Sequence, residues 1–560
     1  MSTLLLQHGV TAQAEAHPEA IAVAFKDTRL TYGALEGTSN QLARLLADAG
    51  CRRGDRIALW MPKIPVAIIA MLGALKADAI YVPLNPADPP ARLARTLAAS
   101  DCNCILAAGR IAPTLAETLA TAALPQPPLI GWLDDEIAAA PELAPAFSLR
   151  DLAAYPATPP AYANTGDDLA HILFTSGSTG VPKGVMITHA SVAQVIRWAV
   201  SYFGLGRTDR ISQHSPLRFD VSTFDIFGAL CAGAELHLVP PELNLLPHKL
   251  AQFIRSAELT QWFSVPSVLN LMAKFDVIRQ DDFPTLRRVL FAGEVLPTPT
   301  LIHWMRRLPR AQFTNLYGPT ETTIVSSYYT VPRCPADERE AIPIGWPCDG
   351  EELLVLDDQL RTVAPGETGD LYIRGAGLSP GYWRDAEKTR TAFISGPNGT
   401  DRMYKTGDLA RRGADGLVHF VGRADTQIKS RGYRIELGEI EAALNMLPGL
   451  RESAVVAIES SGFEGWLICC AYAPSSDDSA SAESLRRGLA GLVPNYMLPA
   501  RWRRYDALPR NPNGKCDRPR LRQSFLIAES HAKEPEEPSP EHVDRPDRTP
   551  SVVQTDLEWS

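Results

Sequence analysis

Segments with the apolar pattern of strands alternate with segments of helical pattern along the chain. Helical patterns cover Leu30 to Leu46 and residues 191–198, residues 75–84 change from helix to buried strand, and strand-like segments occupy 235–239 and 288–291. Strands that are separated by helices pair in parallel, and helices cover both faces of such a sheet. The sequence therefore predicts an α/β fold of βαβ-type parallel sheets.

The length of the chain and a change of pattern predict more than one domain. The 560 residues exceed what one hydrophobic core usually supports. Short strands with Pro and Gly turns follow at 350–381, and a mixed helix and strand pattern begins after Asp425. We expect a large N-terminal domain with a small β-subdomain over residues 1–424 and an α+β lid over 425–529. A Pro- and acid-rich tail over 530–560 is predicted to be disordered.

The overall charge argues against nucleic acid or an anionic membrane as a partner. The net charge is −9 and the pI is near 5.7. No apolar run approaches the roughly 18 residues that a membrane helix needs. The nine cysteines lack the spacing of a zinc site, so we expect reduced, structural thiols and a cytoplasmic protein.

A segment rich in glycine and hydroxyl groups follows the apolar run Ile172 to Phe174. Residues 175–184 are TSGSTGVPKG. Glycine lets the backbone bend sharply, while hydroxyl and amide groups can donate hydrogen bonds to phosphate oxygens. Because Gly184 follows Lys183, the segment is not a GxxxxGK[ST] loop. Alone it is equally consistent with a surface turn.

Five further motifs follow this segment in a fixed order. They are NLYGPTE at 315–321, GDLYIRG at 369–375, YKTGDL at 404–409, GRADTQIKSRGYRIELGEIE at 422–441 and NGKCDR at 513–518. Together the six segments resemble the amino-acid adenylation domains of the adenylate-forming superfamily. The resemblance implies the fold of that superfamily, with a mobile C-terminal lid that rotates about a hinge at Asp425.

The same resemblance implies a two-step reaction that uses ATP and Mg²⁺. A carboxylate would be activated as its adenylate with release of pyrophosphate, and the acyl group would then pass to the phosphopantetheine thiol of a carrier protein. No condensation-domain motif and no carrier attachment serine is found. We therefore expect a free-standing enzyme that loads a separate carrier protein, or an aminoacyl group already held on it.

The resemblance also assigns roles around the nucleotide. The loop at 175–184 would surround the β- and γ-phosphates, Asn315 and Tyr317 would contact adenine, and Asp408 would bind the ribose hydroxyls. Phe420 stands where many family members have a tyrosine. The expected nucleotide-binding residues are Thr175, Ser176, Gly177, Ser178, Thr179, Lys183, Gly293, Asn315, Tyr317, Asp408, Phe420 and Arg423.

Three residues are expected to carry catalysis. Glu321 would be the Mg²⁺ ligand with support from Thr320, since this hard cation prefers carboxylate oxygens. Lys515, on a lid loop, would contact the substrate carboxylate and ATP. After the first step the lid would rotate and present residues 429–434 to the pantetheine arm, with Gly432 letting the arm pass.

Residues 219–225 resemble the substrate-pocket motif of amino-acid adenylation domains. Asp220 would pair with the substrate ammonium, because a buried carboxylate without a partner is costly. Asp225 lies five residues further on, and the role is assigned to Asp220 and not to Asp225 only by alignment with the motif. The other expected pocket residues are Val221, Phe224, Ser264, Leu290, Ala292, Leu316, Ile324 and Val325.

These pocket side chains are mostly apolar and several are bulky, which predicts a small neutral amino acid. L-Alanine comes first, then serine or glycine, with a β-amino acid as an alternative. Ser264 could favour a serine hydroxyl or bond to the local backbone. An acyl- or aryl-CoA ligase is the chemical rival, disfavoured by Asp220, and a non-catalytic carrier-binding protein is disfavoured by the intact Glu321, Asp408 and Lys515.

Overall fold

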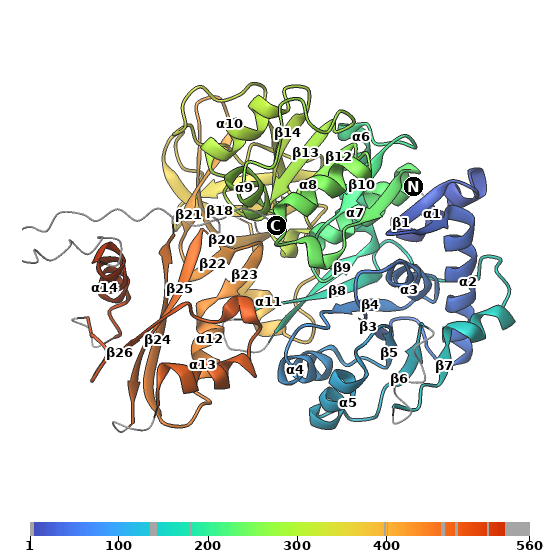
Figure 1. Ribbon diagram of the computed structural model, residues 1–560, viewed down its shortest axis with the longest axis horizontal. Helices are drawn as coiled ribbons and strands as arrows, with labels where there is room; N and C mark the ends of the chain where they lie inside the picture. The colour runs from blue at the N-terminus through green and yellow to red at the C-terminus, as the bar shows by residue number, and fades with distance from the viewer. Residues whose placement is uncertain are drawn as a thin grey trace, which may run out of the picture.

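The computed structural model describes most of the chain (Figure 1). The described residues are 5–134, 143–177, 182–396, 399, 401–460, 465–475, 480–511 and 515–531. Ser178 and Thr179 of the predicted phosphate loop lie outside them. So do residues 512–514 beside Lys515 and nearly all of the predicted tail.

The first of two large sheets has seven strands in the order β7-β6-β5-β3-β4-β8-β9, all parallel except for the β8–β9 pair. Its elements are α2 (Tyr32–Asp48), β3 (Arg56–Trp60), α3 (Pro65–Lys76), β4 (Ile80–Leu84), α4 (Pro90–Ser100), β5 (Cys104–Ala107), α5 (Ala112–Thr121), β6 (Leu129–Trp132), β7 (Phe147–Ser148), the 3₁₀ helix η3 (Leu149–Ala154), β8 (Leu169–Thr175) and β9 (Lys183–Thr188).

The second large sheet has nine strands in the order β16-β15-β14-β13-β12-β10-β11-β1-β2, with a parallel centre and antiparallel edges. Its elements are α1 (Leu6–Ala16), β1 (Ile21–Phe25), β2 (Thr28–Thr31), α6 (His189–Phe203), β10 (Arg210–Gln213), α7 (Asp220–Ala232), β11 (Glu235–Leu238), η4 (Pro241–Leu243), α8 (Pro247–Ser256), β12 (Gln261–Ser264), α9 (Pro266–Lys274), β13 (Arg288–Ala292), α10 (Thr298–Arg307), β14 (Gln312–Tyr317), η5 (Thr320–Thr322), β15 (Ser327–Thr330) and β16 (Trp346–Pro347).

A smaller antiparallel sheet occupies the region where the sequence changes to short strands. It comprises β17 (Glu351–Leu356), β18 (Thr368–Gly375), β19 (Phe393–Ser395), β20 (Arg402–Arg412) and β21 (Val418–Arg423), with α11 (Ala386–Ala392) beside it. The predicted α/β class and small β-subdomain are thus confirmed.

The C-terminal elements, which we call the lid, pack against one side of these sheets (orange to red in Figure 1). The lid has a hairpin and a three-stranded sheet with helices, and Asp425 lies between β21 and the hairpin. Its elements are β22 (Gln427–Ser430), β23 (Tyr433–Glu436), α12 (Leu437–Leu444), β24 (Leu450–Glu459), β25 (Trp466–Pro474), α13 (Ala482–Ala490), η6 (Asn495–Met497), β26 (Arg501–Arg504) and α14 (Arg518–His531).

Local sequence signals account for several boundaries. The hydroxyl groups of Thr31 and Thr188 accept hydrogen bonds from Ala34 N and Ser191 N, which caps α2 and α6. Gly204 and Gly233 end α6 and α7 in the left-handed conformation that glycine adopts without strain. The central strands of both sheets are buried along their length, as covered parallel sheets require.

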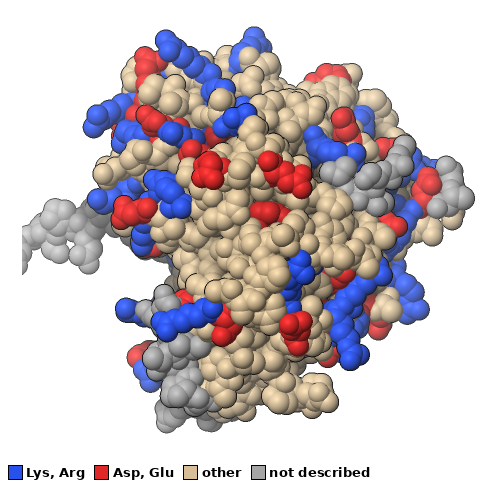
Figure 2. All heavy atoms as spheres, turned by 90° about the vertical axis from the view of Figure 1, so that its right-hand side faces the viewer, with Lys and Arg blue, Asp and Glu red and all other residues tan. Residues whose placement is uncertain are grey.

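The surface carries both signs of charge. Figure 2 shows Lys and Arg side chains interspersed with Asp and Glu on one face, with broad uncharged areas between them. All nine cysteines are free thiols. Within the described part of the chain, no helix has the length and apolar character that crossing a membrane requires.

Candidate active site

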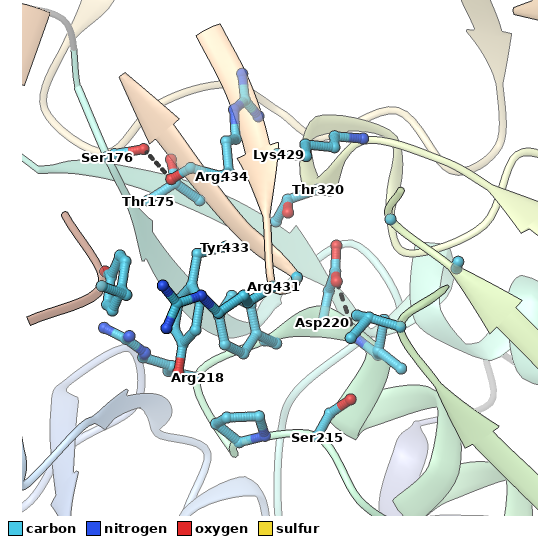
Figure 3. A pocket seen from close by; sticks show the side chains of 18 of the residues that line it. Thr175, Ser176, Ser215, Arg218, Asp220, Thr320, Lys429, Arg431, Tyr433 and Arg434 are labelled. Carbon is cyan, nitrogen blue, oxygen red and sulfur yellow. Dashed lines mark hydrogen bonds between the residues drawn. The ribbon is translucent and has the colours of Figure 1, made fainter. Parts of the chain in front are cut away.

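A cavity of about 560 Å³ lies where the lid meets the two large sheets. It is lined by Thr175 and Ser176 at the end of β8, Asp220 and Val221 at the start of α7, and Thr320, together with residues of the lid hairpin (Figure 3). Sequence motifs about 250 residues apart therefore meet at one place.

An ion pair between the lid and the core lies beside the cavity. Arg434 Nη1 in β23 is 2.8 and 3.0 Å from the two carboxylate oxygens of Glu321, whose side chain is fully buried. The Tyr382 hydroxyl donates a further hydrogen bond to Glu321 at 2.9 Å. Burial alone would raise the pKa of Glu321, but Arg434 and Lys183 outweigh it and hold that pKa at about 2. Glu321 is therefore ionised.

The same strand of the lid lies across the predicted phosphate loop. The Ser176 hydroxyl donates a hydrogen bond of 2.7 Å to the backbone carbonyl of Arg434. Lys183 Nζ lies 5.4 Å from the centre of the Tyr382 ring and 4.0 Å from Glu436, and burial lowers its pKa. Thus β23 covers two of the groups that the sequence assigned to phosphate and metal binding.

The predicted ribose and adenine residues form one connected cluster. The Tyr317 hydroxyl donates a hydrogen bond of 2.5 Å to Asp408, which also pairs with Arg423. β20 pairs with β21 so that Asp408 faces Arg423 across the strands. Asn315 donates to Pro343 O at 2.8 Å, while Phe420 is half-buried against the cluster that contains Tyr317. Of the predicted nucleotide residues, Thr175, Ser176, Gly293, Asp408 and Arg423 line the cavity.

Asp220 also lines the cavity, in the first turn of α7. Its carboxylate accepts a hydrogen bond of 2.8 Å from Val221 N. Burial nevertheless raises the pKa of Asp220. Thr320, which was expected to support the metal ligand, lines the cavity directly before Glu321 in the chain. A cationic group in the cavity would stabilise ionised Asp220.

Some of the predicted substrate-pocket residues line the cavity, and the others are buried without lining it. Val221, Ala292 and Ile324 line the cavity with Asp220. The other five do not line it and are at most 1% exposed; they are Phe224, Ser264, Leu290, Leu316 and Val325. Phe224 packs edge-on against Phe263, and the Ser264 hydroxyl accepts a 2.9 Å hydrogen bond from Trp262 Nε1. The hydrogen-bond partner of Ser264 in this structure is thus the side chain of Trp262.

The geometry distinguishes the two aspartates of this motif. Asp225 is buried outside the cavity lining, and both of its oxygens lack a hydrogen-bond partner among the described residues. Its charged neighbour is Lys63, which donates to the carbonyls of Gln213 and His214 at 2.9 and 2.6 Å. Burial raises the pKa of Asp225 well above its usual range and lowers that of Lys63 to about 7. Only Asp220 lies where a substrate can reach it.

The two functional loops of the lid lie in opposite environments. Lys429, Arg431 and Gly432 line the cavity, and Gly432 N donates a hydrogen bond of 2.8 Å to Glu294. Lys515 is exposed and does not line the cavity; its backbone N donates to Asn511 Oδ1 at 3.0 Å. In this lid orientation the cavity is thus lined by residues of the hairpin and not by Lys515.

Sequence reasoning missed three residues at the contact between lid and core. Arg218, Asp88 and Tyr496 all line the cavity, together with Tyr433 of the predicted segment 429–434. Arg218 directly precedes the substrate motif, so it had a signal in the sequence. Asp88 and Tyr496 had none.

The residues present fit ATP and Mg²⁺. Glu321 is an ionised, buried carboxylate whose present partner is a cation of the lid, and such oxygen ligands suit a hard divalent ion. Asp408 offers carboxylate oxygens at the cavity wall, where hydroxyl groups of a ribose can donate to them. Thr175 and Ser176 add hydroxyl donors for phosphate oxygens.

Comparisons with known proteins agree with this geometry. The AMP-binding enzyme family matches residues 10–383, and the AMP-binding enzyme C-terminal domain matches residues 439–515. The chain is 37% identical over 525 residues to L-proline--[L-prolyl-carrier protein] ligase of Streptomyces coelicolor, covering 93% of this chain and 96% of that protein. It is 36% identical to the dimodular nonribosomal peptide synthase of Bacillus subtilis over 94% of this chain, but spans only 22% of that synthase.

Solved structures show the same fold. The Vibrio cholerae adenylation domain AlmE, in complex with glycyl-adenosine-5'-phosphate, matches with a TM-score of 0.81 at 26% identity, over 93% of this chain and 98% of that one. NpsA-ThdA, an artificially fused adenylation and carrier-protein didomain from Klebsiella oxytoca, matches with a TM-score of 0.74 at 25% identity, over 95% and 98%. The chain therefore belongs to the AMP-binding enzyme family, as an amino-acid adenylation domain of the adenylate-forming superfamily that uses ATP and Mg²⁺.

Proposed function

We propose that the enzyme activates a small neutral amino acid, with L-alanine first and serine or glycine next, and loads it onto a separate carrier protein. The observation that carries this proposal is Asp220, a half-buried carboxylate with a raised pKa that lines the cavity beside Val221, Ala292 and Ile324. An ammonium group would offset the cost of burying its charge. Val221, Ala292 and Ile324 are apolar, so none of these three offers a charged partner to an acidic or basic substrate side chain.

The nucleotide and metal roles belong to the same proposal. Glu321 would hold Mg²⁺, which neutralises phosphate charge when it is bound, and Asp408 would hold the ribose. Lys183 and the hydroxyl groups of the phosphate loop would orient the triphosphate. Because β23 now covers Ser176 and Glu321, these groups become available only when the lid moves away.

We further propose that the chain divides into a core over residues 1–424, a lid over 425–529 that rotates about Asp425, and a tail over 530–560. Lid rotation would bring Lys515 to the substrates for the first step. The present orientation, with Gly432 in the cavity, suits the second step, in which a pantetheine thiol must reach the acyl group. The carrier would be a separate protein, and the reaction would take place in the cytoplasm.

The test is amino-acid-dependent exchange of pyrophosphate into ATP in the presence of Mg²⁺. The substrates tested would be the proteinogenic amino acids, several β-amino acids, and propionate and benzoate as acids without an amine. Exchange confined to alanine and its small neutral neighbours would support the proposal. Exchange with β-amino acids alone would move the substrate to that class, exchange with propionate or benzoate would favour a CoA ligase, and silence throughout would contradict amino-acid activation.

A further inference from the structure

A single arginine of the core contacts two aromatic rings of the lid. The guanidinium carbon of Arg218 lies 5.6 Å from the ring centre of Tyr433 and 5.4 Å from that of Tyr496. These two rings are stacked on each other, with centres 3.7 Å apart and planes 12° apart. Phe219 completes the group, 5.3 Å from Arg218 and edge-on to Tyr433 at 5.4 Å. The cation therefore lies beside a stacked pair of lid rings and next to Phe219 of the core. Figure 3 labels Arg218 and Tyr433.

The charge of Arg218 is fixed by a buried aspartate. Its Nη1 lies 2.8 Å from Asp88 Oδ2, and the two side chains are only 12% and 8% exposed. Burial would lower the pKa of Arg218, but Tyr496, Asp88 and Tyr433 outweigh it and raise that pKa. The guanidinium is thus a permanent cation that is largely removed from water, where cation–π attraction is strongest.

A second core arginine makes contact with the lid beside this cluster. Asp88 Oδ2 is also 3.6 Å from Arg92 Nε, and Arg92 pairs with Glu439 in α12. Arg95, one turn along α4, donates a hydrogen bond of 2.9 Å to Leu492 O of the lid. Arginines of α4 therefore bind a carboxylate and a backbone carbonyl of the lid, while Arg218 contacts its aromatic rings.

Tyr433, which Arg218 contacts, lies between two residues of the lid that also contact the core. Its neighbour Gly432 lines the cavity and bonds to Glu294, and its other neighbour Arg434 pairs with Glu321. A side chain that holds Tyr433 therefore also holds the backbone on which both of these contacts depend. All three contacts join the lid to the core in the orientation seen here.

We propose that Arg218 is a positioning residue for the transfer half-reaction: through its contacts with Tyr433 and Tyr496 it holds the lid with residues 429–434 in the cavity. The inference rests on the proposed function and deepens it, because it assigns the orientation of the lid in the second step to a residue of the core. Arg218 takes no part in adenylate formation, when the lid has turned and both rings have left it.

The contact with the rings depends on the arginine group and not only on its positive charge. Arginine carries a delocalised, weakly hydrated cation, whereas the ammonium of lysine is a compact, strongly hydrated charge. Arg218→Lys keeps the attraction to Asp88 and weakens the contact with the rings. Tyr496→Phe keeps the ring, while Tyr496→Ala removes it from the lid side of the contact.

The experiment measures both half-reactions on the full chain. The first is amino-acid-dependent pyrophosphate exchange, and the second is loading of a phosphopantetheinyl carrier protein, with kcat and the KM for carrier measured separately. The variants are Arg218→Lys, Tyr496→Ala and Tyr496→Phe. Arg210→Lys, a surface arginine of β10 paired with Glu235 and Glu258, is the matched control. Thermal unfolding verifies that each variant is folded.

We expect Arg218→Lys and Tyr496→Ala to lower kcat of loading about tenfold, the effect of roughly 1.4 kcal/mol of lost cation–π and stacking attraction. The KM for the carrier protein and the rate of pyrophosphate exchange should stay unchanged in these two variants. Tyr496→Phe and Arg210→Lys should load the carrier protein at the rate of the unmodified enzyme. Unchanged loading, an equal fall in exchange, or a change confined to the KM for carrier would each overturn the inference. Absence of exchange in the unmodified enzyme would instead refute the proposed function.

Discussion

The two loops of the lid that the sequence marks as functional differ in almost every physical respect. Residues 429–434 lie in the cavity, with Lys429 buried near the Tyr317 ring and Arg434 paired with Glu321. Lys515 is exposed and lies outside the cavity lining. Both loops belong to the lid, so the environment of each follows from the orientation of the lid and not from its own sequence.

This difference shows why one active site can serve two reactions. The hairpin places a cation on Glu321 and a backbone carbonyl on Ser176, which are the groups assigned to metal and phosphate. Under the proposed assignments, the hairpin and the triphosphate would compete for the same groups. Adenylate formation would then require the hairpin to leave, and the hairpin would return for the second step.

Among the variants considered, replacement of Lys515 should cause the largest difference between the rates of the two steps. We expect Lys515→Ala to slow pyrophosphate exchange about 1000-fold, since a preorganised charge at the reacting centre is worth that much. Transfer from a supplied aminoacyl adenylate to the carrier should be nearly unchanged, because Lys515 is remote from the cavity in this orientation. Lys26→Ala, an exposed lysine paired with Glu242, is the control. Equal loss of both steps would show that the two loops do not divide the work.

Gly432→Ala, in the loop that lines the cavity, should impair the second step and not the first. Gly432 has a φ of +78°, and a Cβ there would lie 2.6 Å from Val265 Cγ1. Strain of about 1 to 3 kcal/mol predicts a tenfold to hundredfold loss of carrier loading with exchange preserved. Gly465→Ala, at a lid glycine with a φ of +72° and open space around it, controls for backbone strain alone. If both variants load normally, the hairpin does not need its present fit.

The substrate end of the cavity should respond to pH through Asp220. Its pKa is raised by burial, so it takes up a proton more readily than an exposed aspartate as the pH falls. Protonation removes the charge that binds the ammonium, and the KM for the amino acid should therefore rise toward low pH. We expect Asp220→Asn to raise this KM by about 30-fold, roughly the 2 kcal/mol of a charge-assisted hydrogen bond, and to flatten its pH profile. An unchanged profile would assign the amine elsewhere.

The smallest expected effect concerns competition between Arg434 and Mg²⁺. Arg434→Gln keeps a hydrogen-bonding side chain but removes the charge that holds Glu321. The Mg²⁺ concentration that gives half-maximal exchange should fall about fivefold, a coupling of roughly 1 kcal/mol. Arg487→Gln, on an exposed face of the lid, should leave it unchanged. A higher Mg²⁺ requirement in Arg434→Gln would mean that the arginine assists metal binding.

The sequence predicted features that depend on one segment at a time. The α/β class, the small β-subdomain and the strand at residues 288–291 were predicted from apolar pattern, and they are confirmed. Asp220, Thr175 and Asp408 belong to compact motifs, and the structure brings them to one cavity. Such motifs are visible because the chemistry requires those residue types in close succession.

Features that depend on two distant surfaces were not predictable. Leu290 and Ala292 lie in the same buried strand, and only the packing of the sheet decides that Ala292 lines the cavity while Leu290 does not. Likewise, Arg218 and Tyr496 are 278 positions apart and meet only because the lid adopts this orientation. Neither residue carries a local pattern that indicates its partner.

Movement of the lid is tested most directly by the distance between the core and the lid in solution. Spin labels would be attached through non-natural amino acids at Arg361 in the core and Arg487 in the lid, whose side chains are 70% and 78% exposed. Double electron–electron resonance would compare the ligand-free enzyme with the enzyme that holds Mg²⁺, a non-hydrolysable ATP analogue and the amino acid. We expect the ligand-free distance to agree with this structure and the ligands to move the population to a second distance. A single distance that the ligands leave unchanged would contradict the claim that the hairpin must vacate the nucleotide site.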